Sequence, residues 1–366
     1  MAHALDRRGF FAAGALLPLM TDALPAATAG QAPPLRLSLN ENPFGPSPAV
    51  RRALAAEAAR LSRYADPDAA DRLTRIVAER EGVPPGQIIL GDILERLGIH
   101  LAAQAPAGGR FILSTPGYTA LTDAAATLGG QTVGVPLDRN LANDLPALTE
   151  AVKGSARALF LVNPHNPTGI VGASAQWDSF LTDAAARTLV IVDEAYLDYD
   201  DLPRLTAARL TRAGHNVAVF RTFDKIHGLA ALPFGYLVAP APLAGSLRQS
   251  GVGAAHGLSR LALAGAEAAL ADTAWTQEVR RRTLAGRDRL SRALSRLGLE
   301  QTPSHANFLF FRSPAADALR AGLARSGILV GRTFPPLGDW IRITVGTEDE
   351  VTRTIHALEQ LAGASA

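Results

Sequence analysis

Short apolar segments that alternate with amphipathic helical patterns constrain the fold of this 366-residue chain more than any other feature. Most of the segments are continuous apolar runs, which is the pattern of strands buried on both faces of a sheet. Strands separated by helices form right-handed β–α–β units, so the pattern predicts a mainly parallel, seven-stranded sheet between two helical layers. The predicted strands are Gln87–Leu90, Arg110–Leu113, Thr132–Val135, Ala158–Val162, Thr188–Val192, Val217–Phe220 and Gly235–Val238.

The segments on either side of this predicted sheet have a different texture. A proline-marked arm over Leu39–Pro46 precedes a predicted helix over Pro48–Leu61. We therefore expect residues 30–62 to form an N-terminal arm and part of a small domain, residues 63–245 a three-layer large domain, and residues 246–366 a smaller α/β domain. After Pro240 we expect a helical region over Leu258–Leu297, strands over Asn307–Phe311 and Trp340–Val345, and helices over Ala315–Ser326 and Glu348–Leu361.

The first 29 residues are typical of an export signal. Arg7 and Arg8 precede Gly-Phe-Phe and the apolar stretch Ala12–Met20, and the small residues Ala27–Gly30 supply an A-x-A cleavage site. The paired arginines resemble the twin-arginine type of signal. The apolar stretch is too short for a stable membrane anchor. We therefore expect residues 1–29 to be a signal and the protein to be periplasmic or secreted.

Composition excludes several functional classes. The chain has no cysteine, so disulfides, thiolate metal sites and cysteine nucleophiles are ruled out. The net charge is only +2 and there is no basic run, so nucleic acid is not an expected partner. The histidines do not form a metal set: His100 and His356 lie in predicted helices, and His165 lies in a turn. His305, close to Asn307, is a weaker candidate for contact with a substrate.

Lysine is almost absent from the chain, and one of its two lysines lies at a predicted strand end. Of the 36 lysines and arginines only Lys153 and Lys225 are lysine, so 34 are arginine. Arginine stays charged at any working pH, whereas a buried lysine can lose its proton and become a nucleophile. Lys225 follows the strand Val217–Phe220, where open α/β sheets build their sites. These features make Lys225 the leading candidate for a nucleophilic amine.

Polar motifs follow three of the predicted strands. Asn163–Gly169 follows one strand, Asp193–Tyr196 the next, and the Lys225 segment the third. In a parallel sheet these motifs meet at one edge, which brings an asparagine, an aspartate, a tyrosine and a lysine together. Such a set suits pyridoxal 5′-phosphate: the lysine forms a Schiff base, and the aspartate keeps the pyridine nitrogen protonated.

The chain resembles a fold-type I, pyridoxal-phosphate-dependent aminotransferase of class I/II, of the histidinol-phosphate aminotransferase type. The resemblance covers nearly the whole chain after the signal, and the text around Lys225 resembles a twin-arginine-exported branch of that family. The motifs that carry it are Asn40–Gly45, Arg63-Tyr64, Thr115–Tyr118, Asn163–Gly169, Asp193–Tyr196, Phe223–Gly228, Ala306–Phe308 and Trp340–Arg342.

The resemblance implies roles for particular residues. Lys225 would be the Schiff-base lysine, Asp193 would pair with the pyridine nitrogen, and Tyr118 would stack on the ring. Arg342 would hold a substrate carboxylate, as a bidentate guanidinium suits. Further implied site residues are Asn166 and Tyr196 on the ring oxygen, Asn42 and Arg332 toward the substrate, and Tyr64 reaching the phosphate of a partner subunit in a homodimer.

Three positions depart from the family pattern at the cofactor phosphate. Asp224 stands where a serine is usual and Pro233 where an arginine is usual. The turn Gly91–Glu95 is shorter than the family's phosphate-binding turn and carries acids. We expect a rebuilt phosphate site in which Thr222 supplies a hydroxyl and Arg221 and His227 supply positive charge.

The leading hypothesis is an aminotransferase that moves an amino group between an amino acid, or a related amine, and a 2-oxo acid through a Lys225 aldimine. A lyase, decarboxylase or racemase that uses the same cofactor is an open alternative, because fold does not determine reaction. The altered phosphate positions keep a second alternative open, which is a non-catalytic periplasmic binding protein.

Overall fold

The computed structural model describes residues 33–200 and 202–363. From Leu35 onward the chain forms one compact unit, so the division into residues 30–62, 63–245 and 246–366 stays a prediction. The predicted signal over residues 1–29 lies outside the described residues. No helix within the described ranges has the length and apolar character needed to cross a membrane.

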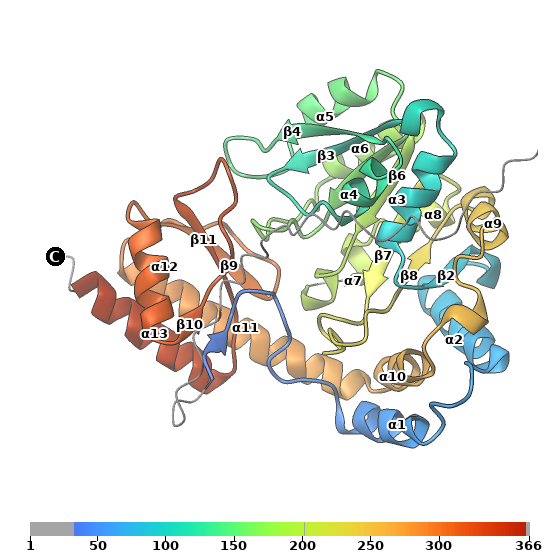
Figure 1. The fold of residues 1–366 in the computed structure, drawn as a ribbon. Helices are drawn as coiled ribbons and strands as arrows, with labels where there is room; N and C mark the ends of the chain where they lie inside the picture. The colour runs from blue at the N-terminus through green and yellow to red at the C-terminus, as the bar shows by residue number, and fades with distance from the viewer. Residues whose placement is uncertain (1–32, 201, 364–366) are drawn as a thin grey trace, which may run out of the picture. The chain divides into compact units, whose positions relative to one another are not determined.

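Seven strands form the central sheet, in the order β2-β8-β7-β6-β5-β3-β4 (Figure 1). All pairs are parallel except those of β8, which runs antiparallel to both β2 and β7. The predicted mainly parallel sheet is therefore confirmed, and each predicted segment contributes a strand. The strands are β2 Ile88–Gly91, β3 Arg110–Thr115, β4 Gln131–Pro136, β5 Ala158–Val162, β6 Leu189–Asp193, β7 Val217–Thr222 and β8 Gly235–Val238.

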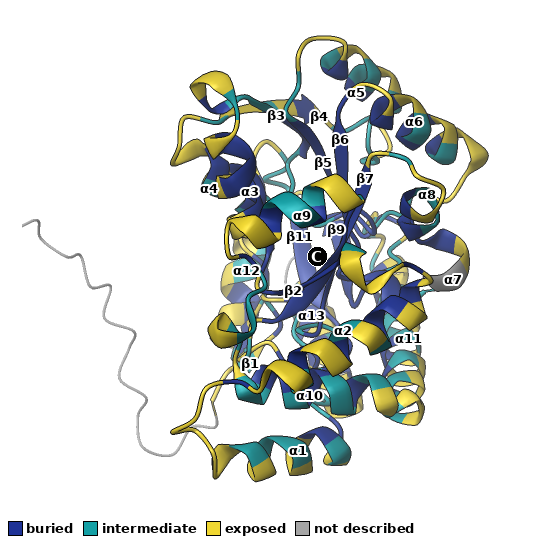
Figure 2. Cartoon of the chain, turned by 90° about the vertical axis from the view of Figure 1, so that its right-hand side faces the viewer, coloured by how far each residue is buried: buried dark blue, intermediate teal, exposed yellow. Residues whose placement is uncertain are grey.

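Helices cover both faces of this sheet, because its strands are apolar on both sides. In β6, Val190 and Val192 join one buried cluster, and Leu189 and Ile191 join the other. Figure 2 shows the strands as buried and the outer helices with exposed outer faces. The first cluster packs on α2 Pro67–Glu81, α5 Leu145–Val152, α6 Ala175–Ala185, α8 Ala208–Arg212 and α10 Arg260–Ala271. The second packs on α3 Leu94–Ala103, α4 Ala120–Ala126 and α9 Ala241–Gln249.

The C-terminal part has a smaller core of its own. Strands β9 Phe308–Arg312 and β11 Trp340–Thr344 pair antiparallel, and β1 Leu35–Arg36 pairs with β10 Ile328–Leu329. Apolar residues of these strands pack on three helices. These helices are α11 Thr273–Arg296, α12 Ala316–Arg325 and α13 Glu348–Gly363. Helix α1, Pro48–Ala58, packs on α10. The remaining elements are the short helix α7 Leu202–Leu205 and the 3₁₀ turns η1 Pro85–Gln87, η2 Pro106–Gly108, η3 Leu197–Tyr199 and η4 Ala255–Gly257.

The helical region expected over Leu258–Leu297 is two helices rather than one. Asp272 separates α10 from α11, and its side chain accepts a hydrogen bond from the backbone N–H of Trp275 at 3.1 Å. An aspartate in this position satisfies a free N–H of the first helical turn, so it favours a new helix start over a continuous helix.

Candidate active site

Three adjacent parallel strands, β5, β6 and β7, end at the same edge of the sheet and carry the three polar motifs. Val162 pairs with Asp193, and Asp193 pairs in turn with Phe220. The segments that follow the three strands therefore leave the sheet side by side, at the same edge. The structure thus brings Asn166, Asp193 and Lys225 to one place from three separate segments.

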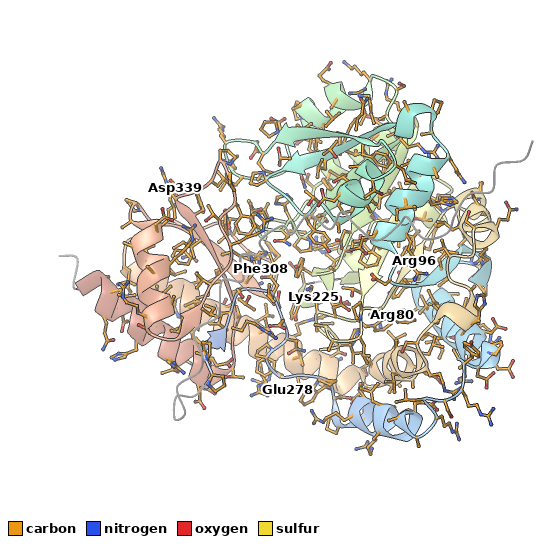
Figure 3. The ribbon with its side chains drawn as sticks, in the orientation of Figure 1. Arg80, Arg96, Lys225, Glu278, Phe308 and Asp339 are labelled. Carbon is orange, nitrogen blue, oxygen red and sulfur yellow. The ribbon has the colours of Figure 1, made fainter. Side chains whose placement is uncertain are left out.

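A cavity of about 730 Å³ lies at this edge. It contains Lys225, which follows β7 (Figure 3). Most of the predicted site residues line it together: Tyr118, Asn166, Asp193, Tyr196, Thr222, Lys225, Arg332 and Arg342. The cavity lies between the large sheet and the strand β11, which supplies Arg342.

Asp193 is the buried acid of the cavity. Strand alternation places it on the face of β6 that carries Leu189 and Ile191, and only 3% of it is exposed. Its carboxylate accepts a hydrogen bond from the N–H of Ala195 at 3.0 Å. Burial raises the pKa of Asp193 to about 7, although the Ala195 N–H and the charge of Lys225 oppose the shift. A carboxylate in this state is stabilised by any cationic group that binds beside it.

Tyr196 is held by a residue that sequence reasoning missed. Asn40 in the N-terminal arm donates a hydrogen bond to the Tyr196 hydroxyl at 3.0 Å and lines the cavity. The Lys225 amine lies 5.9 Å from the centre of the Tyr196 ring. Asn40 has a φ of +56°, a left-handed conformation that asparagine tolerates better than most residues. The Asn-Glu-Asn sequence was the available signal, but it did not distinguish Asn40 from Asn42.

Two predicted site residues are not among those lining the cavity. Asn42 donates to the carbonyl of Ile226 at 2.8 Å and accepts from the N–H of Phe44 at 2.9 Å, so its side chain holds the arm against the Lys225 loop. Tyr64 is 84% exposed. Its predicted role belongs to a partner subunit's site, and that role stays a prediction.

Arg342 has one buried donor without a partner in the described chain. Its Nη1 donates to Asn166 at 2.6 Å and its Nη2 to the carbonyl of Ser38 at 2.6 Å, whereas its Nε has no acceptor among the described residues. Burial lowers the pKa of Arg342. Arg332 lies nearby, and both guanidinium groups stack on the Phe334 ring, at 4.6 Å and 5.2 Å from its centre. A buried cation with a free donor is a site for an anion.

The other walls of the cavity are acidic. Asp92 comes from the β2–α3 turn, Glu95 from the first turn of α3 and Asp123 from α4, and Asp224 directly precedes Lys225. Burial raises the pKa of Asp224, with Lys225 opposing the shift and the charge of Asp92 adding to it. The Thr222 hydroxyl donates to the Phe234 carbonyl at 3.3 Å and accepts from the Asp224 N–H at 3.0 Å.

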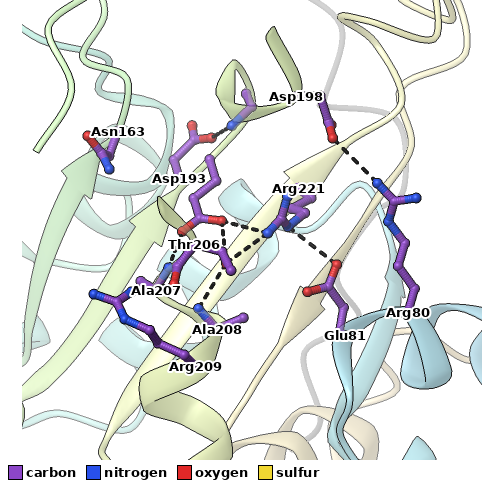
Figure 4. A network of polar contacts seen from close by, with 12 residues as sticks. Arg80, Glu81, Asn163, Asp193, Asp198, Thr206, Ala207, Ala208, Arg209 and Arg221 are labelled. Atoms are coloured by element: carbon purple, nitrogen blue, oxygen red, sulfur yellow. Dashed lines mark hydrogen bonds and ion pairs between the residues drawn. The ribbon is translucent and has the colours of Figure 1, made fainter. Parts of the chain in front are cut away.

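The two residues expected to supply positive charge to this wall do not do so. Arg221 points to the opposite face of β7, where its Nη2 lies 2.8 Å from Glu194 and its Nε 3.5 Å from Glu81 (Figure 4). Arg221 and Thr222 are consecutive strand residues, so their side chains must take opposite faces. His227 is buried beside Phe223, and burial lowers its pKa to about 4, so it is neutral at pH 7.

The remaining histidines have structural contacts. His165 is buried, its Nδ1 lies 3.1 Å from the Thr168 hydroxyl, and burial lowers its pKa to about 4. His305 pairs with Asp200 and is not a residue of the cavity wall. His100 lies 3.0 Å from the Ser246 hydroxyl, which agrees with a packing role. Within the described ranges no three acidic or histidine side chains are grouped as a metal would require.

Comparison with known proteins identifies the family of the chain. A family model described as aminotransferase class I and II matches residues 32–358. The chain is 36% identical to a histidinol-phosphate aminotransferase of Symbiobacterium thermophilum, over 90% of this chain and 91% of that protein. It is also 36% identical to an aromatic amino acid aminotransferase of Thermobifida fusca, over 86% of this chain and 87% of that protein.

A solved structure shows the same fold. The histidinol-phosphate aminotransferase of Sinorhizobium meliloti, determined in complex with pyridoxal-5′-phosphate, superposes with a TM-score of 0.82 at 28% identity. The match covers 92% of this chain and 93% of that one. The matching family model, the relatives and the fold agree, and the chain belongs to the class I and II aminotransferase family.

Proposed function

We propose that this chain is a pyridoxal 5′-phosphate-dependent aminotransferase that exchanges an amino group between an amino acid and a 2-oxo acid. The observation that carries the proposal is the convergence of Lys225, Asp193, Asn166, Tyr196 and Arg342 on one cavity. These groups come from four separate segments and include a nucleophile, a proton-holding acid and an anion-binding cation. The set has no evident purely structural purpose.

The residues around Lys225 fit the ring of this cofactor. Asp193 is a buried carboxylate whose raised pKa favours a bound cationic partner, which a protonated pyridine nitrogen supplies. Tyr118 and Tyr196 offer an aromatic face and a hydroxyl on the walls of the same cavity. Asn166 lines the same cavity, and its side-chain oxygen accepts a hydrogen bond from Arg342.

When bound, pyridoxal 5′-phosphate supplies an aldehyde that attaches to a lysine and a ring that draws electrons from the bonds of an attached amine. Lys225 would hold the cofactor and, once freed by the amino donor, would move a proton at the donor's Cα. Asp193 would keep a proton on the ring nitrogen, and Tyr196, whose hydroxyl accepts a hydrogen bond from Asn40, would donate to the ring oxygen. Because these groups would act together on one reaction, the effects of substituting them should not be additive.

The substrate end of the cavity is formed by Arg342. Its Nε has no partner in the part of the chain that the structure describes, and its guanidinium lies over Phe308 and Phe334, which suits a carboxylate bound against an apolar surface. Amino acids and 2-oxo acids both carry that carboxylate, so one arginine serves both half-reactions. Arg332 adds a second, more exposed cation beside it.

The proposal extends to assembly and location. The exposed Tyr64, together with exposed Leu61 in the same segment, supports a homodimer in which Tyr64 completes the partner's site.

The paired Arg7 and Arg8 before an apolar stretch support export through a twin-arginine signal. Expression of the full chain and fractionation of the cells would test the export directly: retention with the signal intact would contradict it.

The activity is tested with the full chain, pyridoxal 5′-phosphate and a panel of amino donors. We expect 2-oxo acid to form to one equivalent per site without an acceptor and to continue only when a second 2-oxo acid is added. Lys225→Ala should lower turnover by at least about a hundredfold. Lys153→Ala is the matched control, because Lys153 is the other lysine of the chain and is exposed. Release of 2-oxo acid beyond one equivalent without an acceptor would favour a lyase.

A further inference from the structure

The cavity has an unequal distribution of charge. Its walls carry five acids, Asp92, Glu95, Asp123, Asp193 and Asp224, and three bases, Lys225, Arg332 and Arg342. Attachment of the cofactor uses the Lys225 amine, and the two arginines lie together beside Asn166 and Phe334. In the proposed function, Arg342 and Arg332 bind the substrate carboxylate. The cavity therefore has no further cation among the described residues for a phosphate dianion.

The backbone offers little replacement for a missing cation. The N-terminus of α3 opens into the cavity through Leu94 and Glu95, and helix N-termini attract anions. No side chain caps this terminus, but the exposed acids Asp92 and Glu95 lie beside it and oppose the approach of an anion. The Thr222 hydroxyl is engaged with the Phe234 carbonyl and the Asp224 N–H.

The two cations that the sequence suggested for the phosphate site are committed elsewhere. Arg221 is 3% exposed, faces away from the cavity and is paired with Glu194 and Glu81. Withdrawing it would leave two buried carboxylates without a partner, which is strongly unfavourable. His227 is buried against Phe223 and is neutral at pH 7. Neither group can swing into the cavity without a large loss of stability.

We propose that this chain holds its cofactor through the ring and Lys225 rather than through the phosphate, and therefore binds the unphosphorylated aldehyde, pyridoxal, about as tightly as pyridoxal 5′-phosphate. The acids at the cavity mouth repel the phosphate dianion, so the phosphate contributes little net affinity. This inference depends on the proposed function, because it assumes that the ring binds at Lys225.

The test compares the two aldehydes on the full wild-type chain. Each is titrated and then fixed with borohydride: the amine and the aldehyde condense with loss of water, and hydride reduces the resulting C=N bond to a secondary amine. Peptide mass analysis then gives the occupancy of Lys225, and Lys153 reports background reactivity of an exposed lysine. We expect the two apparent dissociation constants to agree within about tenfold, a difference of at most about 1.4 kcal/mol.

The salt dependence of aldehyde binding gives a second test, because repulsion and attraction of the phosphate predict opposite changes in affinity. Raising the salt concentration from about 20 mM to about 300 mM screens the exposed acids, so it should strengthen binding of pyridoxal 5′-phosphate and leave pyridoxal unchanged. A phosphate held by cations would bind more weakly at the higher salt concentration.

Substitutions that neutralise single acids test the same repulsion residue by residue. Asp224→Asn and Asp92→Asn should each strengthen binding of the phosphorylated aldehyde by about threefold to tenfold, without changing that of pyridoxal.

Asp183→Asn is the matched control, because Asp183 is exposed on α6 and is not a residue of the cavity wall. A preference for pyridoxal 5′-phosphate of more than about tenfold in the wild-type chain, weakened by salt, would overturn the inference. That result would show that another cation, such as one from a partner subunit, holds the phosphate. Attachment of neither aldehyde to Lys225 would instead overturn the proposed function, and with it this inference.

Discussion

Adjacent acids at the end of β6 illustrate how position separates residues of the same type. Asp193 faces the cavity, whereas Glu194 faces the opposite side of the sheet and pairs with Arg221. Burial raises the pKa of each to about 7, so their ionisation alone does not distinguish them. Their neighbours do: Asp193 accepts a hydrogen bond from the Ala195 N–H and lies near the charges of Lys225, Glu194 and Asp224, and its carboxylate faces the cavity, where a cationic ligand can bind.

Substitution of Asp193 tests its role in holding a proton on the ring nitrogen. Asp193→Asn keeps the shape and removes the charge, so cofactor binding should weaken, but at saturating cofactor Lys225 should still be modified while turnover falls by about 10²- to 10⁴-fold. Single-turnover absorbance changes with an amino donor measure the loss. Wild-type rates in a variant with full cofactor occupancy would exclude this role for Asp193.

At the scale of elements, a buried ionic cluster joins the structures that carry the site (Figure 4). Arg221 of β7 contacts Glu194 after β6 and Glu81 at the end of α2. Thr206 donates to Glu194 at 2.9 Å, and the Tyr236 hydroxyl of β8 donates to Glu81 at 2.7 Å. The cluster therefore fixes the ends of β6 and β7 from the face opposite the cavity, which keeps Asp193 and Lys225 in register.

Removal of Arg221 should be costly and pH-dependent. Arg221→Met leaves Glu194 and Glu81 buried without a cation, which should lower the free energy of unfolding by about 3–5 kcal/mol. Without Arg221 the folded-state pKa of Glu194 should rise further above its unfolded value. The folded state then binds more protons than the unfolded state at acidic to neutral pH, so the variant loses stability as the pH rises.

Denaturant unfolding at pH 5 and pH 8 measures this effect. Arg72→Met is the matched control, since the Arg72–Glu267 pair is exposed and such pairs contribute about 0–1 kcal/mol. A loss that is the same at both pH values, or no larger than that of the control, would show that the cluster does not depend on the Arg221 charge.

At the scale of the whole molecule, the cavity is completed by segments far apart in sequence. The arm residue Asn40 contacts Tyr196 after β6, and its N–H donates to Thr344 of β11 at 3.0 Å. Asn307 donates to the Asn40 carbonyl at 3.1 Å, so the arm is held between the large sheet and the C-terminal strands. Tyr64 lies farther along the chain than the arm, is exposed, and remains available for contact with a second copy of the chain.

Mixed dimers test whether sites are shared between subunits. Lys225→Ala removes the amine to which the cofactor attaches, and Tyr64→Ala removes the side chain that would complete the partner's site. Each variant homodimer should therefore be impaired. Unfolding and refolding an equal mixture should restore about a quarter of wild-type activity, because half of the dimers are hybrids and each hybrid has one complete site. A mixture no more active than the sum of its parts would contradict shared sites.

Much of the fold was predictable because burial leaves a direct mark on the sequence. The seven apolar runs became the seven strands of the sheet, and the polar residues after β5, β6 and β7 lie at its edge. The break at Asp272 was not predicted, because a capping hydrogen bond depends on a single residue within a helical pattern. The contribution of Asn40 was also missed, since its contacts to Tyr196 and Thr344 span long stretches of chain.

The sequence by itself determined the α/β class, the sheet edge that carries the chemistry, and the identities of Lys225 and Asp193, because strand burial and the order of the motifs are local properties. Only the tertiary structure decided where the charges lie. Alternation along β7 turns Arg221 away from the cavity, while Asp224 after β7, Asp92 after β2 and Glu95 in α3 lie on its walls. The direction of a side chain in a folded sheet depends on pairing register and packing, and these are set by contacts between distant segments.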